Sequence, residues 1–114
     1  MAECLFCRIA AKEIPAQVVY EDELIIAFRD INPQAPVHLL IIPKGHVASV
    51  REIDEAHPLV AGRLLRVARD LAKQEGVAES GYRLVVNTGQ DAGQAIAHLH
   101  LHLLGGRAMG WPPG

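Results

Sequence analysis

The chain is poor in cysteine and in aromatic residues, and it carries no excess of positive charge. Of its 114 residues, two are cysteine and 4% are aromatic, and the formal net charge is −2 at pH 7. No run of Lys and Arg forms the basic patch that is typical of proteins that bind nucleic acid or a charged membrane surface. We therefore expect neither nucleic acid nor a membrane as a partner.

Long hydrophobic runs are also absent. No apolar stretch approaches the roughly 20 residues that cross a bilayer as a helix. The first residues, Met1-Ala2-Glu3-Cys4, lack the basic and apolar regions of a signal peptide. These absences predict a cytoplasmic location, where two cysteines are reduced or bind a metal rather than form a disulfide.

What the chain does contain is an ordinary globular mixture, with 50% hydrophobic and 21% charged residues. Its length suits one hydrophobic core, so we expect a single domain over residues 1–114. Runs of β-branched and apolar residues predict strands over 17–21, 24–28, 37–43, 82–87 and 98–104. The run at 37–43 is apolar almost throughout, as expected of a central strand that is covered on both faces.

Two helices are expected, a short one over 5–12 and a long one that ends near Glu75. Asp54 is the predicted N-cap of the long helix, Pro58 fits its first turn and Gly76 ends it. The order of strands and helices, with short connections, predicts an α+β fold with an antiparallel sheet. The long helix has one apolar stripe, made by Val60, Leu64, Val67, Ala68 and Leu71.

The segment 98–104 is the most unusual in the chain. His98, His100 and His102 alternate with leucines, and alternate residues of a strand share a face. The three imidazoles therefore share one face, and the leucines face a core. Two alternatives remain open, a half-buried strand with histidines on its exposed face and a set of three metal ligands.

The loop over 87–94 precedes these histidines and contains two glycines. Glycines allow backbone N–H groups to approach an anion closely. Histidine can attack phosphorus and form a covalent intermediate, while neighbouring histidines stabilise charge or transfer protons. An anion-binding loop beside histidines therefore indicates phosphoryl or nucleotidyl transfer.

The chain resembles the histidine triad (HIT) superfamily, whose signature is His-x-His-x-His followed by two apolar residues. Residues His98 to Leu104 match that signature, and the resemblance spans nearly the whole chain. It is strongest to the Hint branch, which ends in Trp-Pro-Pro-Gly as residues 111–114 do here. Further matching segments are Ile14-Pro15-Ala16, Phe28-Arg29-Asp30-Ile31, Gln34-Ala35-Pro36-Val37-His38, Ile42-Pro43-Lys44 and Gly105-Gly106-Arg107.

The resemblance implies a purine nucleoside phosphoramidase, which hydrolyses the P–N bond of AMP-type phosphoramidates such as adenylated lysine. It implies that His100 is the nucleophile that forms a nucleotidyl-histidine intermediate. His102 would contact the phosphate oxygens, and His98 and His38 would complete the histidine cluster. A dinucleoside polyphosphate hydrolase is an alternative, and so is a nucleotide-binding regulatory or scaffold protein with slow turnover.

The same resemblance implies a substrate site. Asp30 matches the carboxylate that binds ribose, although a turn-capping role is an equal alternative. The apolar nucleobase pocket would consist of Phe6, Ile14, Phe28 and Ile31, although the sequence alone favours plain core residues at these positions. The phosphate cradle would consist of Asn87, Gly93, Gln94 and Ala95, and Trp111 would reach the site of a partner subunit.

Ala95 departs from the family pattern, in which serine is usual. Alanine cannot donate the hydrogen bond that the serine hydroxyl would give to the phosphate or leaving group. The lost bond corresponds to about 1 kcal/mol. This difference keeps open the alternative of a nucleotide-binding protein with slow turnover.

Cys4 and Cys7 form a Cys-x-x-Cys pair, for which zinc needs two more ligands. Some bacterial relatives hold a structural zinc at positions that correspond here to Cys4, Cys7, His46 and His98. The thiols could instead pack as small apolar groups. We expect no cofactor to be required for catalysis.

The Hint branch also implies a homodimer in which the sheet extends across both subunits. A five-stranded sheet in so short a chain leaves an edge to cover. The expected partners are thus a purine nucleotide substrate and a second copy of the chain.

Overall fold

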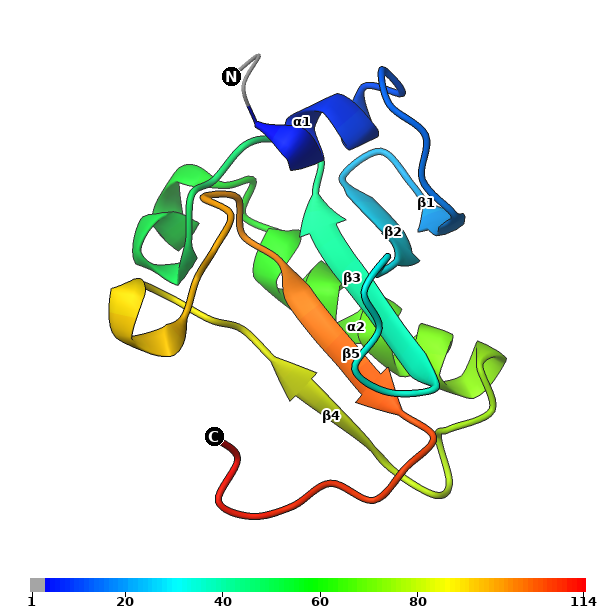
Figure 1. The fold of residues 1–114 in the computed structure, drawn as a ribbon. Coiled ribbons are helices and arrows are strands. Elements are labelled where there is room, and N and C mark those ends of the chain that lie inside the picture. Colours follow the sequence, from blue (N-terminus) through cyan, green and yellow to red (C-terminus); the bar gives the residue numbers. More distant parts are fainter. Residues whose placement is uncertain (1–3) are drawn as a thin grey trace.

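The computed structural model describes residues 4–114 and contains one five-stranded sheet (Figure 1). The strands follow the order β1-β2-β3-β5-β4, and every neighbouring pair is antiparallel. This confirms the predicted α+β class and the antiparallel sheet. The strands are β1 (Val18–Glu21), β2 (Ile25–Arg29), β3 (Val37–Pro43), β4 (Tyr82–Val85) and β5 (Leu101–Gly105).

The short and the long helix are both present, as α1 (Leu5–Ala10) and α2 (Val60–Gln74). Figure 1 shows α2 crossing behind the sheet, and it contacts β3, β5 and β2. Two 3₁₀ helices, η1 (Val50–Glu55) and η2 (Gln90–Ala92), lie in the connections. Among the helices of residues 4–114, none has the length and apolar character to cross a membrane. The cytoplasmic location stays a prediction.

The start of α2 differs from the prediction that Asp54 caps it. Asp54 lies inside η1, which Ser49 caps by accepting a hydrogen bond from the N–H of Arg51 at 3.1 Å. The chain is then extended at Ala56, with ψ 165°. This residue separates the two helices, so α2 begins only after Pro58.

Side chains of the sheet alternate between two apolar clusters, one on each face. On the α2 face the cluster includes Leu99, Leu101 and Leu103, together with the apolar stripe of the helix. The opposite cluster forms around α1 and consists of Phe6, Ile9, Ile26, Phe28, Leu40 and Ile42. β3 contributes to both clusters, as expected of a central strand. The leucines therefore face the core, and the histidines between them face the side of α1.

β5 is shorter at its start than the predicted strand over 98–104. It begins at Leu101, because the N–H of Leu99 donates to the carbonyl oxygen of Val47 at 2.7 Å instead of to a sheet neighbour. The alternation nevertheless continues through residues 98–100, since Leu99 is 3% exposed and packs in the core. His98 and His100 thus lie on the segment that leads into the strand.

The turn between β1 and β2 is organised by the carboxylate of Asp22. It accepts hydrogen bonds from the N–H groups of Leu24 and Ile25, from the hydroxyl of Tyr20 and from the guanidinium of Arg63 on α2. Burial alone would raise the pKa of Asp22, but these hydrogen bonds outweigh it and hold the pKa at about 2. The charged carboxylate therefore stabilises the folded protein.

We expect this contribution of Asp22 to disappear in acid. The pKa is depressed on folding from 3.8 to about 2, so the stabilisation is complete above pH 3.8 and is lost as the pH falls through about 2. Urea unfolding at pH 5 and at pH 2.5 should show the wild type losing its advantage over Asp22→Asn at the lower pH. A difference in unfolding free energy that stays constant between the two pH values would contradict this expectation.

Candidate active site

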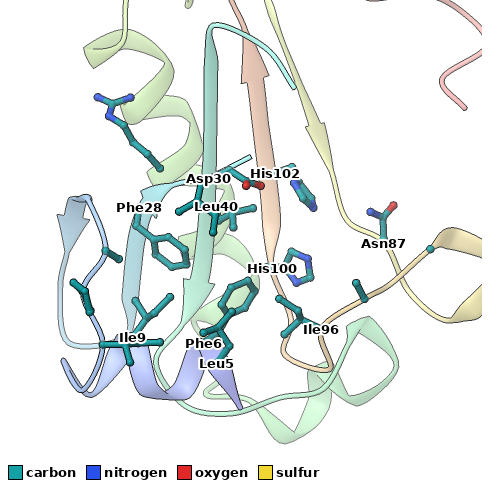
Figure 2. A pocket seen from close by; sticks show the side chains of 17 residues that line it. Leu5, Phe6, Ile9, Phe28, Asp30, Leu40, Asn87, Ile96, His100 and His102 are labelled. Carbon is teal, nitrogen blue, oxygen red and sulfur yellow. The ribbon is translucent and has the colours of Figure 1, made fainter. Parts of the chain in front are cut away.

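A cavity of about 400 Å³ opens on the α1 face of the sheet (Figure 2). It is bounded by α1 and the chain that follows it, by the ends of β2 and β5, and by the loop between β4 and β5. The lining residues are Leu5, Phe6, Ile9, Ile14, Pro15, Ala16, Phe28, Arg29, Asp30, Ile31, Leu40, Asn87, Gly93, Ala95, Ile96, His100 and His102. The cavity therefore joins a largely apolar region to two of the histidines.

The apolar region contains all four residues predicted for it. Phe6 and Phe28 meet edge to face, with their ring centroids 5.6 Å apart, and Ile14 lies beside them in the lining. Ile31 is 99% exposed and stands at the rim. Phe6 and Phe28 are also buried core residues. These two side chains therefore belong both to the core and to the lining of the pocket.

His100 is 7% exposed and projects into the cavity. Its Nδ1 lies 2.7 Å from the carbonyl oxygen of His98. A carbonyl oxygen only accepts hydrogen bonds, so Nδ1 of the neutral ring carries the proton. Nε2 of His100 then keeps a free lone pair, which is the form of imidazole that acts as a nucleophile.

His102 lies beside His100, with 5.0 Å between the ring centroids. Its Nδ1 is 2.9 Å from Nε2 of His38, which in turn lies 3.4 Å from Oδ2 of Asp30. Burial, together with the nearby His100 and His38, lowers the pKa of His102 to about 4. Burial also lowers the pKa of His38, against the opposing effect of Asp30. Both rings are therefore neutral at pH 7.

Asp30 follows β2 and faces the cavity near His102, as Figure 2 shows. Its Oδ1 accepts a hydrogen bond from the N–H of Asn32 at 2.9 Å, which is the turn-capping role of an aspartate. Its second oxygen remains on the side of the histidines. The carboxylate thus stabilises the turn and is also available to a ligand.

The loop between β4 and β5 contributes Asn87, Gly93 and Ala95 to the lining. Gly93 has φ +79°, a left-handed conformation that favours glycine. Gln94 does not line the cavity. Its side chain accepts a hydrogen bond from the N–H of Gly89 and donates to two main-chain carbonyls, so it stabilises the loop instead.

His98 belongs to a second cluster, outside the cavity. Its Nε2 donates to the carbonyl oxygen of Pro43 at 2.8 Å, which leaves a lone pair on Nδ1. That Nδ1 lies 3.3 Å from Sγ of Cys4, and Nδ1 of His46 lies 3.2 Å from Sγ of Cys7. The four ligand atoms lie within 4.8 Å of one another.

This Cys/His cluster has the donor set of a tetrahedral zinc site, two thiols and two imidazoles. Burial, together with the neighbouring Cys4, raises the pKa of Cys7 to about 11. A metal ion would therefore have to displace the thiol protons when it binds. The residues predicted to hold zinc fit that ion in type, number and proximity.

Trp111 is 83% exposed and lies away from the cavity of its own chain. Arg83 on β4 donates a hydrogen bond to the carbonyl oxygen of Gly110 at 2.9 Å, which holds the preceding residue against the edge of the sheet. The structure therefore does not bring Trp111 together with the other predicted site residues.

Several lining residues were not predicted from the sequence. Leu40 could have been placed beside Phe28, because the two are direct partners in the register of β2 and β3. Arg29 lines the cavity, and its guanidinium forms a bidentate ion pair with Glu75 at the end of α2. No sequence pattern indicates that pairing. The remaining unpredicted lining residues are Leu5, Ile9, Pro15, Ala16 and Ile96.

Comparison with known proteins gives relatives that match nearly the whole chain. The purine nucleoside phosphoramidase of Escherichia coli (strain K12) is 49% identical over 108 residues, which are 95% of this chain and 91% of the relative. A 14 kDa zinc-binding protein of Zea mays is 54% identical over 112 residues, covering 96% and 87% of the two chains. The adenylylsulfatase HINT1 of Arabidopsis thaliana is 50% identical, covering 96% and 76%.

Solved structures agree with the sequence comparison. The crystal structure of a HIT family hydrolase from Legionella pneumophila Philadelphia 1 superposes with a TM-score of 0.94 at 55% identity, and the match covers 98% of this chain and 100% of that one. The family model named HIT domain matches residues 11–109. The chain therefore belongs to the HIT family, in its Hint branch.

Proposed function

We propose that this protein hydrolyses the P–N bond of purine nucleoside phosphoramidates through a nucleotidyl intermediate on His100. The observation that carries the proposal is the hydrogen bond from Nδ1 of His100 to the carbonyl oxygen of His98. It leaves the Nε2 lone pair free in a cavity that has an apolar region for a nucleobase. The name of the Escherichia coli relative supports this substrate class.

The cavity suggests how the substrate binds. The nucleobase would pack in the apolar region against Phe6 and Phe28. The ribose hydroxyls would donate to the carboxylate of Asp30, and the phosphate would lie between His100 and the loop that carries Asn87. In that position the phosphorus atom is within reach of the nucleophile.

The reaction then has two steps. Nε2 of His100 attacks phosphorus, a P–N bond forms to the imidazole, and the P–N bond to the leaving group breaks. The departing nitrogen takes a proton from water and leaves as an amine. A second attack on phosphorus by water cleaves the nucleotidyl-histidine, so water supplies both the oxygen of the released nucleotide and the proton of the amine. No cofactor takes part in either step.

Steady-state hydrolysis of an adenosine phosphoramidate is the direct test. We expect turnover with release of AMP and the free amine. A protein that binds AMP but leaves the phosphoramidate intact would overturn the proposal. That result would favour the alternative of a nucleotide-binding regulatory protein, for which Ala95 is the supporting observation because it lines the cavity without a hydroxyl group.

We also propose that Cys4, Cys7, His46 and His98 hold a structural zinc ion. The thiol and imidazole set and its compactness support it, as does the name of the Zea mays relative. We expect one zinc per chain by elemental analysis, and about none in Cys4→Ser/Cys7→Ser. Loss of zinc should lower the melting temperature by on the order of 10 °C.

The control for the zinc experiment is His57→Ala, which changes an exposed histidine outside both clusters. This variant should keep its zinc, and its melting temperature should fall much less than that of the double cysteine variant, because it loses an exposed hydrogen bond from the N–H of Leu59. Equal zinc content in the wild type and in the double cysteine variant would contradict the site.

A homodimer with a continuous sheet also remains a proposal. β1 and β4 are the edges of the sheet, and exposed edges tend to be covered. Val86, at the end of the β4 edge, is 39% exposed, and Trp111 is 83% exposed. Sedimentation equilibrium should give the mass of two chains, and the mass of one chain would overturn the proposal.

A further inference from the structure

A line of hydrogen bonds runs from the loop before β3 to the cavity. The N–H of Gln34 donates to Nδ1 of His38 at 3.0 Å, and Nε2 of His38 lies 2.9 Å from Nδ1 of His102. Both imidazoles are neutral at pH 7, since burial lowers the pKa of each. Each ring therefore has one N–H and one lone pair, and their positions remain to be assigned.

The main-chain amide of Gln34, at the start of the line, determines which nitrogen of each ring carries the proton. An amide N–H can only donate, so Nδ1 of His38 accepts and the ring proton is on Nε2. The carboxylate of Asp30, which can only accept, lies 3.4 Å from the same Nε2 and favours the same tautomer. This N–H is directed to Nδ1 of His102, so His102 has its lone pair on Nδ1 and its proton on Nε2.

The two histidines of the cavity thus have opposite tautomers. His100 has a lone pair on Nε2, because the carbonyl oxygen of His98 accepts from its Nδ1–H. His102 has an N–H on Nε2, because the line of hydrogen bonds from Gln34 ends on its Nδ1. We propose that the main-chain amide of Gln34 is a positioning group that sets these tautomers and makes His102 a hydrogen-bond donor to a phosphoryl oxygen.

The loop that carries this amide is held by the segment after β5. The Nε–H of Arg107 donates to the carbonyl oxygen of Gln34 at 3.0 Å, and the side chain of Gln34 donates to the carbonyl oxygen of Asn32. Gly106, at φ +88°, packs so closely on Pro36 that an added Cβ would lie 2.9 Å from the Cβ of that proline. The segment after β5 therefore keeps the Gln34 amide in line with His38.

The role of this arrangement in catalysis rests on the proposed function, while the tautomers themselves do not. A donor that is already oriented toward the phosphoryl oxygens stabilises the negative charge that develops on them as the bond to His100 forms. His102 keeps its proton throughout, so the arrangement adds no proton transfer to the two steps of the reaction. The opposite tautomer would direct a lone pair at the phosphate and repel it.

The first experiment is ¹⁵N NMR of the imidazole rings in the wild type without ligand. We expect Nε2–H signals for His38 and His102 and an Nδ1–H signal for His100. The amide of Gln34 should also exchange slowly with solvent, although its side chain is exposed. An Nδ1–H tautomer at His38, or exchange of the Gln34 amide at the rate of an unstructured chain, would overturn the inference.

The second experiment removes the amide proton itself. Gln34→Pro has no N–H at this position, whereas the matched Gln34→Ala keeps it. In the proline variant we expect mixed tautomers at His38 and His102 and a fall in kcat of about 10- to 100-fold. The alanine variant should keep the tautomers of the wild type. A proline variant with wild-type tautomers would overturn the inference.

Arg107 provides a milder variant for the case in which the proline variant does not fold. Arg107→Ala should speed the exchange of the Gln34 amide, and Arg107→Lys should restore part of the protection. Unchanged exchange in Arg107→Ala would overturn the positioning role of the arginine. If the wild type does not hydrolyse phosphoramidates, the tautomer spectrum still decides the inference, so the two proposals fail separately.

Discussion

Replacement of His100 by alanine is expected to lower kcat for an adenosine phosphoramidate by at least about 1000-fold, which corresponds to about 4 kcal/mol in the activation free energy. Alanine has no lone pair that can attack phosphorus, and no other side chain that lines the cavity can take the place of Nε2 as the nucleophile. His102 is the nearest imidazole, but its Nε2 carries a proton in the arrangement described above. Steady-state kinetics with parent and variant side by side measure the effect.

Two further measurements separate loss of chemistry from loss of structure. AMP binding by calorimetry should survive in His100→Ala, because the apolar region and Asp30 are intact. His57→Ala is the matched control, since that histidine is exposed and does not line the cavity, and it should keep full activity. Retention of more than a tenth of the parent activity by His100→Ala would refute the covalent mechanism.

Replacement of Leu103 by alanine should have the opposite pattern, with a large loss of stability and little loss of chemistry. Leu103 is fully buried, and on β5 it lies between Leu39 of β3 and Leu84 of β4. Truncation of a buried leucine leaves a cavity and typically costs about 2–5 kcal/mol of unfolding free energy. Urea unfolding followed by circular dichroism measures that cost.

The control for this second prediction is Leu59→Ala, where the side chain is 57% exposed before α2. It should change the unfolding free energy by no more than about 0.5 kcal/mol. The kcat of Leu103→Ala, per folded molecule, should stay within a few-fold of the parent. A loss of activity as large as that of His100→Ala would contradict this prediction. It would show that packing of the leucines against the core also controls the chemistry of the histidines on the opposite face.

Much of the fold follows from periodicity in the sequence. The apolar stripe that includes Leu64, Val67 and Leu71 predicted α2, and the alternation of leucine with histidine predicted which side chains face the core. The continuous apolar run of β3 predicted a strand with both faces covered. These patterns are strong because each element buries one set of side chains, and burial depends on residue type.

Other features depend on main-chain groups, which the sequence does not distinguish. The hydrogen bond of the Leu99 N–H to Val47 delays the start of β5. The extended conformation of Ala56 delays the start of α2, so Asp54 does not cap it. In the proposed arrangement, the tautomers of His38, His100 and His102 depend on the amide of Gln34, which every residue type except proline supplies, and on a carbonyl oxygen, which all residue types supply.

The candidate sites needed more than periodicity. Cys4 and His98 are separated by 94 positions, and no spacing rule joins residues so far apart. The resemblance to relatives identified the Cys/His cluster before the structure brought its members together. It also indicated Asp30, which by composition alone is equally an ordinary turn residue. It was less informative for Gln94, whose side-chain amide binds main-chain groups of its own loop and the carbonyl oxygen of Ala48.

The sheet order has a consequence for how the protein matures on the ribosome. β3 pairs with β2, its neighbour in the chain, and with β5, where His38 and His102, whose side chains lie in hydrogen-bond contact, are separated by 64 positions. During synthesis the first three strands can form a meander early, but β3 then waits with an unpaired apolar edge until β5 has been made. Such edges associate readily with other chains. β5, which carries His102, is thus also the strand that closes the nascent sheet, and a chaperone that shields β3 in the interval would raise the yield of folded protein.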